Sequence, residues 1–246
     1  MNSYLPQLYC GRTMLKMLNM NNYKTLKYLW DEDNPLGYKN RMGLYKTKVE
    51  LEFIKSCLPN HKLNILDIGG GSGRFALPLS KLNHDITVID ISKDAIELAK
   101  QKGLTKSYCV NLMEFNGKEY DVALAIEVFL VTEPTVVFKH AVRLIKKGGI
   151  FIFVGINNQS WRYKIHNIKK RKTKNYDNYN LNQYKKLLFK NGFKIIKIEG
   201  FNWMPFKVNS NNILVPFFEK VEKFFSLNKR LHQSPWLLIS CKNVNQ

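Results

Sequence analysis

A cluster of glycines directly after a short apolar stretch is the part of the sequence best suited to binding a ligand. Residues 65–68 have the β-branched, apolar character of a buried strand, and Asp67 lies near the end of that strand. Four glycines follow within five positions, and residues 74–77 can open a helix. A backbone without Cβ atoms can lie directly against a ligand, while the first N–H groups of a helix point at it. The carboxylate of Asp67 would repel a phosphate there but would suit a cationic group.

Two cofactor patterns compete for these glycines. The dinucleotide pattern G-x-G-x-x-G/A fits only when it begins at Gly71 and ends at Ala76, which leaves Asp67 without a role. The pattern D-x-G-x-G-x-G runs from Asp67 to Gly73 and uses the acid and three glycines together. We therefore favour a cofactor that carries a cationic group, although a merely tight turn between strand and helix would have the same composition.

The run from Asp67 to Gly73 resembles motif I of the class I S-adenosylmethionine-dependent methyltransferases. The resemblance implies S-adenosyl-L-methionine as the cofactor, with Asp67 holding the amino group of its methionine moiety. It also implies that Gly69, Gly70 and Gly71 let the backbone approach the cofactor. Further pieces of the family pattern follow in order over residues 64–155.

Two further strand ends supply residues for the rest of the cofactor. Asp90 ends the apolar run 85–90, roughly 20 residues after the glycines, where an acid can accept two hydrogen bonds from ribose hydroxyls. Ile91 follows it and can pack against the adenine. In the resembled family a polar residue after the third strand reaches the adenine amino group, and the next backbone N–H binds a ring nitrogen. These roles fall to Asn111 and Leu112.

Glu127 ends the nearly continuous apolar run 120–127, which suits a parallel strand covered on both faces. It lies at the carboxyl edge, where ligands bind in open α/β sheets, and we count it among the cofactor-binding residues. The usual continuation in the resembled family is Glu-Val-Leu-Glu-His, but here Leu130 and Val131 replace the second acid and the histidine. This departure argues against a general base or a metal ligand at that point.

The resemblance implies an α/β fold: a Rossmann-like, doubly wound, seven-stranded sheet with helices on both faces and the last strand antiparallel beside the sixth. We divide the chain into an N-terminal helical lid, residues 1–60, and a class I methyltransferase domain, residues 61–246, with a substrate-binding connection at about 201–235. The sequence predicts strands at residues 65–68, 85–90, 108–110, 120–127, 150–155, 193–200 and 236–242. It predicts helices at residues 23–30, 47–58, 74–83, 93–102, 135–145 and 180–190, and a polar stretch at 157–174.

The net charge of +20 is the compositional feature that points toward nucleic acid. Most of it comes from lysines spread over every predicted helix and strand, and only residues 169–174 form a dense basic block. No apolar run approaches the roughly 20 residues of a membrane span. Residues 1–6 lack the features of a secretory signal, so we expect a cytoplasmic protein. The four cysteines form no C-x-x-C pair, which argues against a zinc site.

We expect a metal-free methyltransferase that acts on an oxygen, a nitrogen or an acidic carbon of a small, partly apolar molecule. Neither N-P-P-Y nor D-P-P-Y follows the fourth predicted strand, which disfavours exocyclic amines of nucleic acid. Carboxylates do not cluster there either, which disfavours a divalent metal. The large apolar residues within 14–30 and 201–218 suit a lid that buries a small ligand. His166 is the candidate catalytic base, although a solvated loop histidine is the plainer interpretation.

Two other functions stay open. An RNA- or protein-directed methyltransferase would use the basic surface, and its binding to RNA would weaken as salt rises because phosphate binding releases counterions. A cofactor-binding module without catalysis would bind S-adenosyl-L-methionine without turnover. The sequence does not predict an oligomeric state.

Overall fold

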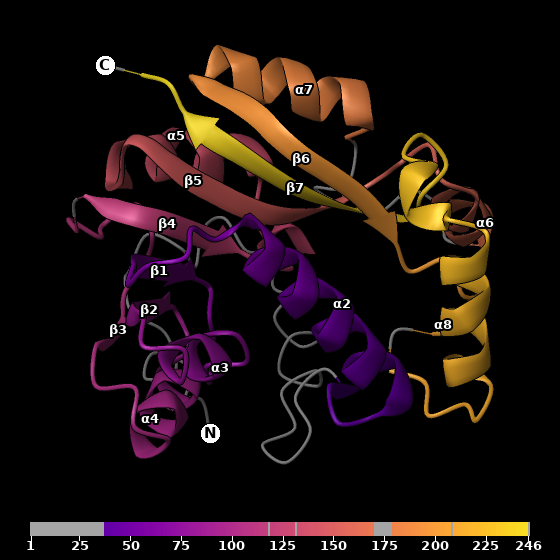
Figure 1. Ribbon diagram of the computed structural model, residues 1–246, viewed down its shortest axis with the longest axis horizontal. Coiled ribbons are helices and arrows are strands. Elements are labelled where there is room, and N and C mark those ends of the chain that lie inside the picture. Colours follow the sequence, from indigo (N-terminus) through magenta and orange to yellow (C-terminus); the bar gives the residue numbers. More distant parts are fainter. Residues whose placement is uncertain (1–36, 118, 131, 170–178, 208, 246) are drawn as a thin grey trace, which may run out of the picture.

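The fold is built on one mixed sheet of seven strands (Figure 1). The computed structural model describes residues 37–117, 119–130, 132–169, 179–207 and 209–245. The strands are β1 (Asn64–Ile68), β2 (Asp85–Asp90), β3 (Ser107–Cys109), β4 (Tyr120–Ala125), β5 (Ile145–Ile156), β6 (Phe193–Phe201) and β7 (Trp236–Asn243). Their order is β3-β2-β1-β4-β5-β7-β6, and β7 runs antiparallel to both of its neighbours. The predicted seven-stranded sheet, with an antiparallel last strand beside the sixth, is confirmed.

Helices cover both faces of this sheet. They are α2 (Arg41–Cys57), α3 (Ala76–Ser80), α4 (Lys93–Gln101), α5 (Pro134–Leu144), α6 (Trp161–Lys169), α7 (Leu181–Lys190) and α8 (Val215–Phe224), with 3-10 turns η3 (Val128–Leu130) and η4 (Leu227–Lys229). Successive residues of a strand point to opposite faces. Phe151 and Phe153 of β5 therefore pack with residues of α5 and α7, whereas Ile152 and Val154 pack with residues of α2, α3 and α4.

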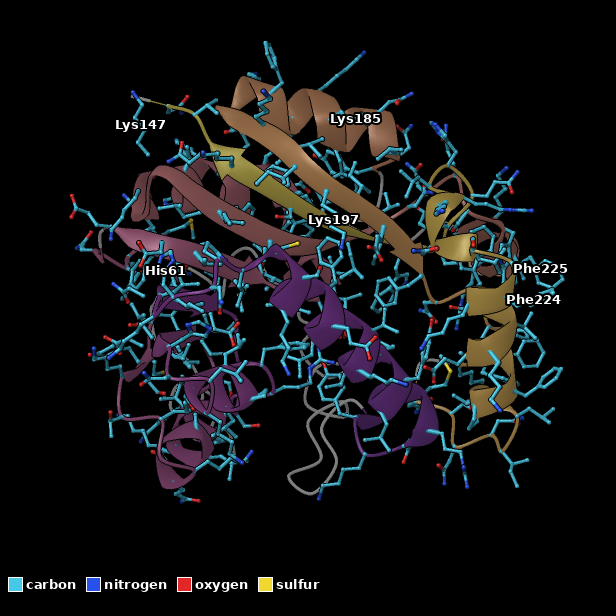
Figure 2. All side chains as sticks on the ribbon, in the orientation of Figure 1. His61, Lys147, Lys185, Lys197, Phe224 and Phe225 are labelled. Carbon is cyan, nitrogen blue, oxygen red and sulfur yellow. The ribbon has the colours of Figure 1, made fainter. Side chains whose placement is uncertain are left out.

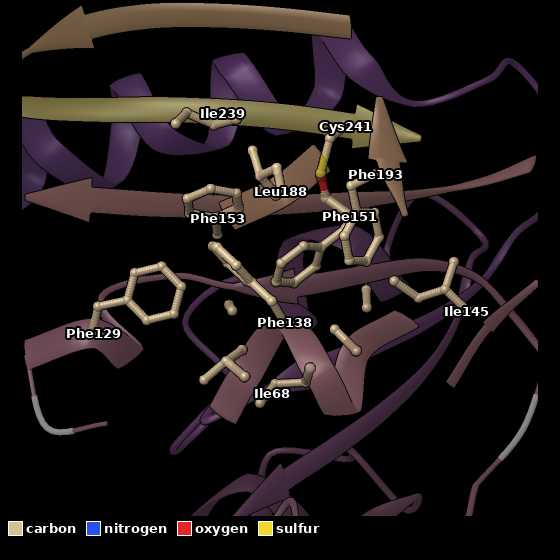
Figure 3. Packing of buried hydrophobic residues seen from close by; sticks show 14 of the residues in the cluster. Ile68, Phe129, Phe138, Ile145, Phe151, Phe153, Leu188, Phe193, Ile239 and Cys241 are labelled. Carbon is tan, nitrogen blue, oxygen red and sulfur yellow. The ribbon is translucent and has the colours of Figure 1, made fainter. Parts of the chain in front are cut away.

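Aromatic rings fill the space between the sheet and α5. The ring centroid of Phe138 lies 5.8 Å from that of Phe151 and 4.9 Å from that of Phe153 (Figure 3). Phe129 of η3 packs 5.3 Å from Phe153, and all four side chains are buried. Burial of one such ring is worth about 1.5–3 kcal/mol, and aromatic pairing adds to it. The cluster thus holds η3, and with it the residues that follow β4, firmly against the sheet.

Several element boundaries differ from the prediction. The helix predicted over 47–58 begins at Arg41, because Met42 and Tyr45 extend its buried face. The helix predicted over 74–83 shortens to α3, because the glycine turn runs on through Gly73, whose φ is +88°. Residues 146–149, which lie between the helix predicted over 135–145 and the strand predicted over 150–155, belong to β5.

Two segments predicted as connections contain helices. The polar stretch 157–174 holds α6, and the hydroxyl of Ser160 accepts a hydrogen bond from the Tyr163 N–H at 3.2 Å, as an N-cap does. The connection at 201–235 holds α8, which packs beside α2 (Figure 1). Over the part of the chain that the structure describes, none of the helices combines the length and the apolar character needed to cross a membrane.

Candidate functional site

The glycine turn after β1 has a backbone that favours glycine. Gly69, Gly71 and Gly73 have φ values of +66°, +54° and +88°, a region in which side chains are strained. The N–H groups of Gly69 and Gly70 donate to the carbonyl of Ile89, at 2.8 and 3.3 Å. These bonds hold the turn against the end of β2, so the carboxyl ends of β1 and β2 form one site.

Little room exists for side chains inside this turn. A Cβ atom on Gly70 would lie 2.6 Å from the carboxyl carbon of Asp67, and one on Gly69 would lie 2.9 Å from a methyl group of Val128. Contacts under 3.0 Å are not sustained in folded proteins. The turn therefore forms a cradle whose walls are backbone, the carboxylate of Asp67 and the side chain of Val128.

The carboxylate of Asp67 is buried at the base of this cradle without full pairing. The side chain is 1% exposed, and its Oδ2 atom has no hydrogen-bond partner within the described residues. Burial raises the pKa of Asp67 to about 7, with the charge of Asp90 adding to the rise and that of Arg74 opposing it. An unpaired buried carboxylate is costly, so the site is suited to a ligand that brings a positive group.

Asp90 lies beside the same turn and is better satisfied. Its Oδ2 accepts from the N–H of Gly71 at 3.0 Å, and its Oδ1 accepts from the N–H of Ser92 at 2.8 Å. Burial raises its pKa, while backbone N–H groups, including those of Ser92 and Gly71, oppose the rise. Each oxygen keeps a second lone pair for another donor. The structure thus brings Asp67, the glycines and Asp90 together, with the half-buried Ile91 next in the chain.

Asn111 and Leu112 follow β3, the neighbour of β2. The N–H of Val110 donates to the carbonyl of Asp90 at 2.9 Å, which ties this turn to the end of β2. Asn111 is buried, and its Oδ1 accepts from the N–H of Met113 at 3.0 Å. Leu112 packs against the main core. The predicted cofactor residues therefore follow three adjacent strands at one edge of the sheet.

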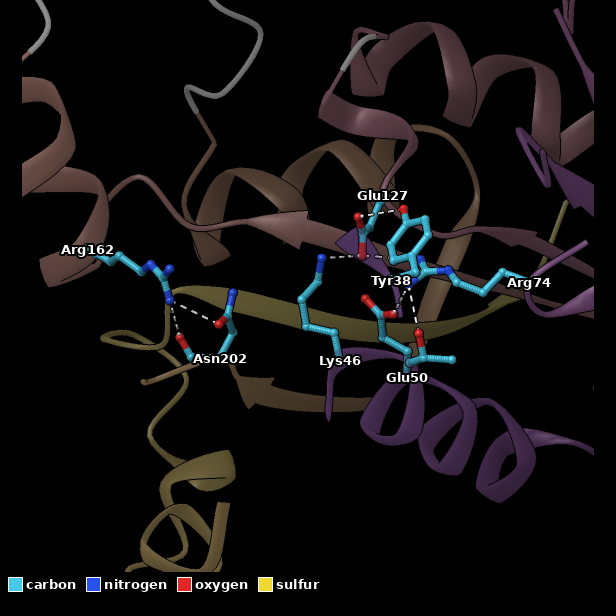
Figure 4. A network of polar contacts seen from close by, with 8 residues as sticks. Tyr38, Lys46, Glu50, Arg74, Glu127, Arg162 and Asn202 are labelled. Atoms are coloured by element: carbon cyan, nitrogen blue, oxygen red, sulfur yellow. Dashed lines mark hydrogen bonds and ion pairs between the residues drawn. The ribbon is translucent and has the colours of Figure 1, made fainter. Parts of the chain in front are cut away.

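Glu127 lies at the same edge, after β4, but its oxygens already have protein partners (Figure 4). Its Oε1 lies 2.8 Å from Lys46 Nζ and 3.2 Å from Arg74 Nη2. Its Oε2 accepts a hydrogen bond from the hydroxyl of Tyr38 at 3.2 Å. Burial alone would raise the pKa of Glu127, but the charges of Lys46 and Arg74 outweigh it and lower the pKa.

Arg74 and Glu50 complete this buried network. Arg74 Nη1 lies 3.1 Å from Glu50 Oε2, and the guanidinium lies 3.8 Å from the ring centroid of Tyr38. Lys46 Nζ lies 4.5 Å from the ring centroid of Trp236 on β7. Burial raises the pKa of Glu50, so that carboxyl is more readily protonated than an exposed one. These contacts, which we call the ion network, fasten α2 to the glycine turn and to the residue after β4.

A second polar cluster joins α6 to the connection after β6. Arg162 Nη1 donates to the side-chain oxygen of Asn202 at 3.0 Å and to the carbonyl of Met204 at 2.8 Å, and Nη2 donates to the carbonyl of Phe206. Asn202 is fully buried, with a φ of +67°. Its Nδ2 atom has no partner in the described part of the chain.

The same connection is joined to α2 through α8. The hydroxyl of Tyr45 donates to Glu222, and Glu222 Oε1 accepts from the N–H of Trp203 at 2.8 Å. The N–H of Asn202 donates to the hydroxyl of Tyr45 at 3.2 Å. The indole Nε1 of Trp203 is buried and lacks a hydrogen-bond partner among the residues described. Two buried donors, on adjacent residues, are therefore left without acceptors.

Three predictions fall wholly or partly outside the described residues: the base His166, the basic block and the N-terminal lid. His166 belongs to α6, but its side chain is not among those described, and residues 170–174 of the basic block are not described at all. Of the predicted lid, residues 37–60 are described, and they hold α2. Within the described ranges, His, Cys, Asp and Glu form no group of three that could hold a metal ion.

Comparison with known proteins agrees with this arrangement. The sequence profile described as "methyltransferase domain" matches residues 66–153. The uncharacterized protein MJ1123 of Methanocaldococcus jannaschii is 31% identical over 174 residues, which cover 68% of this chain and 77% of that protein. The chain belongs to the class I S-adenosylmethionine-dependent methyltransferases. The expected enzyme class is confirmed.

Two further relatives have names that describe an activity. The ubiquinone biosynthesis O-methyltransferase of Hydrogenovibrio crunogenus is 26% identical over 154 residues, which cover 58% of this chain and 62% of that enzyme, less than two thirds of its length. The magnesium protoporphyrin IX methyltransferase of Synechocystis PCC 6803, solved with S-adenosylhomocysteine, superimposes with a TM-score of 0.63 at 14% identity. The superposition covers 95% of this chain and all of that one, so this methyltransferase has the same fold.

Sequence reasoning missed Lys46, Glu50 and Arg162. One signal could have found the first two: they are four residues apart and lie on the same helical stripe as Met42 and Phe53, which are buried. Charged residues within an apolar stripe indicate a buried ion pair. No comparable pattern marks Arg162, because its partners are backbone carbonyls of a distant connection.

Proposed function

We propose that this methyltransferase transfers a methyl group to an oxygen, a nitrogen or an acidic carbon of a small, partly apolar molecule. The observation that carries this is Trp203, a large apolar side chain whose buried indole N–H has no acceptor among the described residues. An acceptor with an apolar body and one polar atom would satisfy it. The name of the relative that methylates an oxygen in ubiquinone biosynthesis supports this class.

The residues around the glycine turn fit the cofactor. The unpaired Oδ2 of Asp67 suits the ammonium of a methionine moiety, and the backbone of Gly70 lies too close to Asp67 for a side chain to fit between them. Asp90 has lone pairs for ribose hydroxyls, Ile91 lies next to it for the adenine, and Asn111 has an amide oxygen for the adenine amino group. The proposed cofactor-binding residues also include Gly69, Gly71, Leu112 and Glu127.

The methyl transfer requires little from the protein beyond orientation of the acceptor. S-adenosylmethionine supplies a methyl group already activated on a sulfonium. The protein's part is to hold the acceptor in line, to exclude water and, for some acceptors, to take up a proton. We propose His166, four residues after Arg162 in α6, as the group that takes it up. The proposal needs no metal ion, so a chelator should leave the rate unchanged.

The N-terminal residues 1–60 form a lid in this proposal. The ion network supports it, because α2 is fastened to the glycine turn by charged side chains rather than by apolar packing alone. The connection at 201–235 completes the acceptor side, since Met204 and Val215 pack against Met42 and Tyr45 of α2. Met204, one of the apolar residues predicted to build the pocket, is fully buried in these contacts.

An RNA- or protein-directed methyltransferase is the alternative, supported by the net charge of +20. The test compares two variants by the transfer of labelled methyl groups to a panel of phenols, amines and 1,3-dicarbonyl compounds, with RNA as a further acceptor. The first replaces Lys169, Lys170, Arg171 and Lys172 by glutamine, and the second is Trp203→Ala. We expect the charge variant to keep its activity on the small acceptor and Trp203→Ala to lose at least about ten-fold in kcat/KM.

S-adenosylhomocysteine affinity, measured by calorimetry, serves as the control, because neither change should alter it. The opposite result would overturn the acceptor class: activity abolished by the charge change and untouched in Trp203→Ala. Loss of affinity for RNA as salt rises would then identify the substrate as a polyanion.

A further inference from the structure

Large apolar side chains of α8 and of the residues that flank it are exposed to solvent. Phe224 is 82% and Phe217 60% exposed, and Phe225, Ile213 and Leu214 are also at least half exposed. We call these five residues the α8 patch. Figure 2 shows Phe224 and Phe225 at the outer edge of the molecule, pointing away from it. Single exposed apolar residues are ordinary, but five within residues 213–225, three of them phenylalanines, indicate a binding surface.

Both acids of α8 point inward, which leaves the outer face without negative charge. Glu219 pairs with Lys48 of α2 at 2.7 Å, and with Lys223 at 3.1 Å. Glu222 bonds to Tyr45 and to the N–H of Trp203. The exposed charged side chains around the patch are all basic: Lys220, Lys223, Lys229 and Arg230.

We propose that the α8 patch docks on an anionic phospholipid surface. Aromatic and aliphatic side chains enter the boundary between headgroups and acyl chains, while lysines beside them stay at the headgroups and attract anionic lipid. α8 has 10 residues, so it can lie on a bilayer but cannot span one. The chain's charge of +20 favours this occupant over a second copy, because two such chains repel each other.

The position of the patch relates membrane docking to the functional edge of the sheet. β6 runs in the same direction as β1, β2 and β4, so the connection that carries α8 leaves the sheet at the edge where those strands also end. Docking would hold that edge near the membrane and give it access to molecules dissolved there. The docking itself requires neither catalysis nor any particular acceptor.

The test is sedimentation of the full chain with vesicles. We expect binding to phosphatidylcholine vesicles that contain about one third phosphatidylglycerol, and at least about ten-fold weaker binding to pure phosphatidylcholine. The double change Phe224→Ser with Phe225→Ser should weaken binding to the anionic vesicles at least about ten-fold. Phe189→Ser is the matched control, because Phe189 is 85% exposed but belongs to α7, which packs against β6 rather than α2.

A charge variant tests whether lysines near the patch attract anionic lipid. Lys220→Gln with Lys229→Gln should weaken binding to anionic vesicles by about five-fold or more, and added salt should have the same effect. Unfolding temperature and S-adenosylhomocysteine affinity should stay at wild-type values in every variant, which shows that the fold is intact.

Three results would overturn the proposal. The first is no sedimentation with anionic vesicles, and the second is an equal loss in Phe189→Ser and in the double phenylalanine variant. The third comes from light scattering: a wild-type dimer that the double phenylalanine change converts to monomer would assign the patch to contact between copies.

Discussion

Asp67 and Glu127 are two buried acids at the same edge of the sheet, yet their surroundings are opposite. Asp67 lies near the end of β1 and Glu127 follows β4, and the two strands are paired neighbours. Glu127 has Lys46, Arg74 and Tyr38 as partners, and its pKa is lowered. Asp67 has an oxygen without a partner, and burial raises its pKa to about 7.

This difference distinguishes an acid that stabilises the fold from an acid that binds a ligand. A paired buried carboxylate contributes to stability as long as its partners remain, whereas an unpaired one costs free energy until something binds it. Position in the sequence does not distinguish the two, because both acids end apolar strands. We therefore infer that Glu127 chiefly anchors α2, and that Asp67 is held ready for the cofactor.

Removing Glu127 should have the largest effect on folding. Glu127→Ala leaves Lys46 and Arg74 buried with one carboxylate fewer, and losing one partner of such a network typically costs about 3–5 kcal/mol. Urea denaturation at about pH 7 measures the free energy of unfolding. Glu199→Ala is the control, because the side chains of the Lys197–Glu199 pair are 37% and 30% exposed and the pair should contribute less than about 1 kcal/mol. Equal losses in the two variants would show that the ion network is not structural.

Replacing Asp67 should stabilise the protein when no cofactor is bound, whereas removing Glu127 should destabilise it. The folded pKa of about 7 exceeds the unfolded value of about 3.9, so the unfolding free energy of the wild type should fall as pH rises from about 4 to 7. Asp67→Asn should lack the part of this slope that comes from Asp67. Above pH 7 the unfolding free energy of Asp67→Asn should exceed that of the wild type by at most about 4 kcal/mol. The difference should stay below this limit because the amide is also buried.

Denaturation curves across this pH range check the prediction. At about pH 4 the two proteins should differ by less than about 1 kcal/mol, because the acid is then protonated in the folded state and about half protonated in the unfolded state. A variant that is less stable than the wild type at pH 8 would mean that the carboxylate of Asp67 has a stabilising partner within the protein.

Asp90 lies between the two cases, and its replacement should have the smallest effect. It accepts backbone N–H bonds from Gly71 and Ser92 but keeps free lone pairs. Asp90→Ala should weaken the binding of S-adenosylhomocysteine by about 1–3 kcal/mol, the usual range for hydrogen bonds to a charged group. An unchanged calorimetric dissociation constant would show that Asp90 only supports the turn.

The sheet could be predicted from the sequence because its strands are short apolar runs with clear boundaries. The run 120–127 and the glycine turn from Asp67 to Gly73 carry local signals that need no knowledge of the rest of the chain. The antiparallel position of β7 came from the family resemblance, since periodicity alone does not give strand direction.

The ion network and α8 could not be predicted because they depend on contacts across long stretches of sequence. Glu127 is 81 residues from Lys46 and 53 from Arg74, and nothing local in the sequence shows which charged residue pairs with which. The inward turn of Glu219 and Glu222 depends on α2, which lies about 170 residues earlier. Such partners are chosen by tertiary packing, which single-sequence patterns do not contain.

The most direct test of the contrast between the two acids is the number of protons released when S-adenosylhomocysteine binds. Calorimetry in two buffers of different ionisation enthalpy measures it. If Asp67 receives the ligand's ammonium, its pKa should fall on binding, and the wild type should release close to one proton at about pH 6 and almost none above about pH 8. Asp67→Asn should release almost none at either pH. Equal release by both proteins at about pH 6, or no release by the wild type, would contradict the assignment of Asp67 as the acid that receives the cofactor.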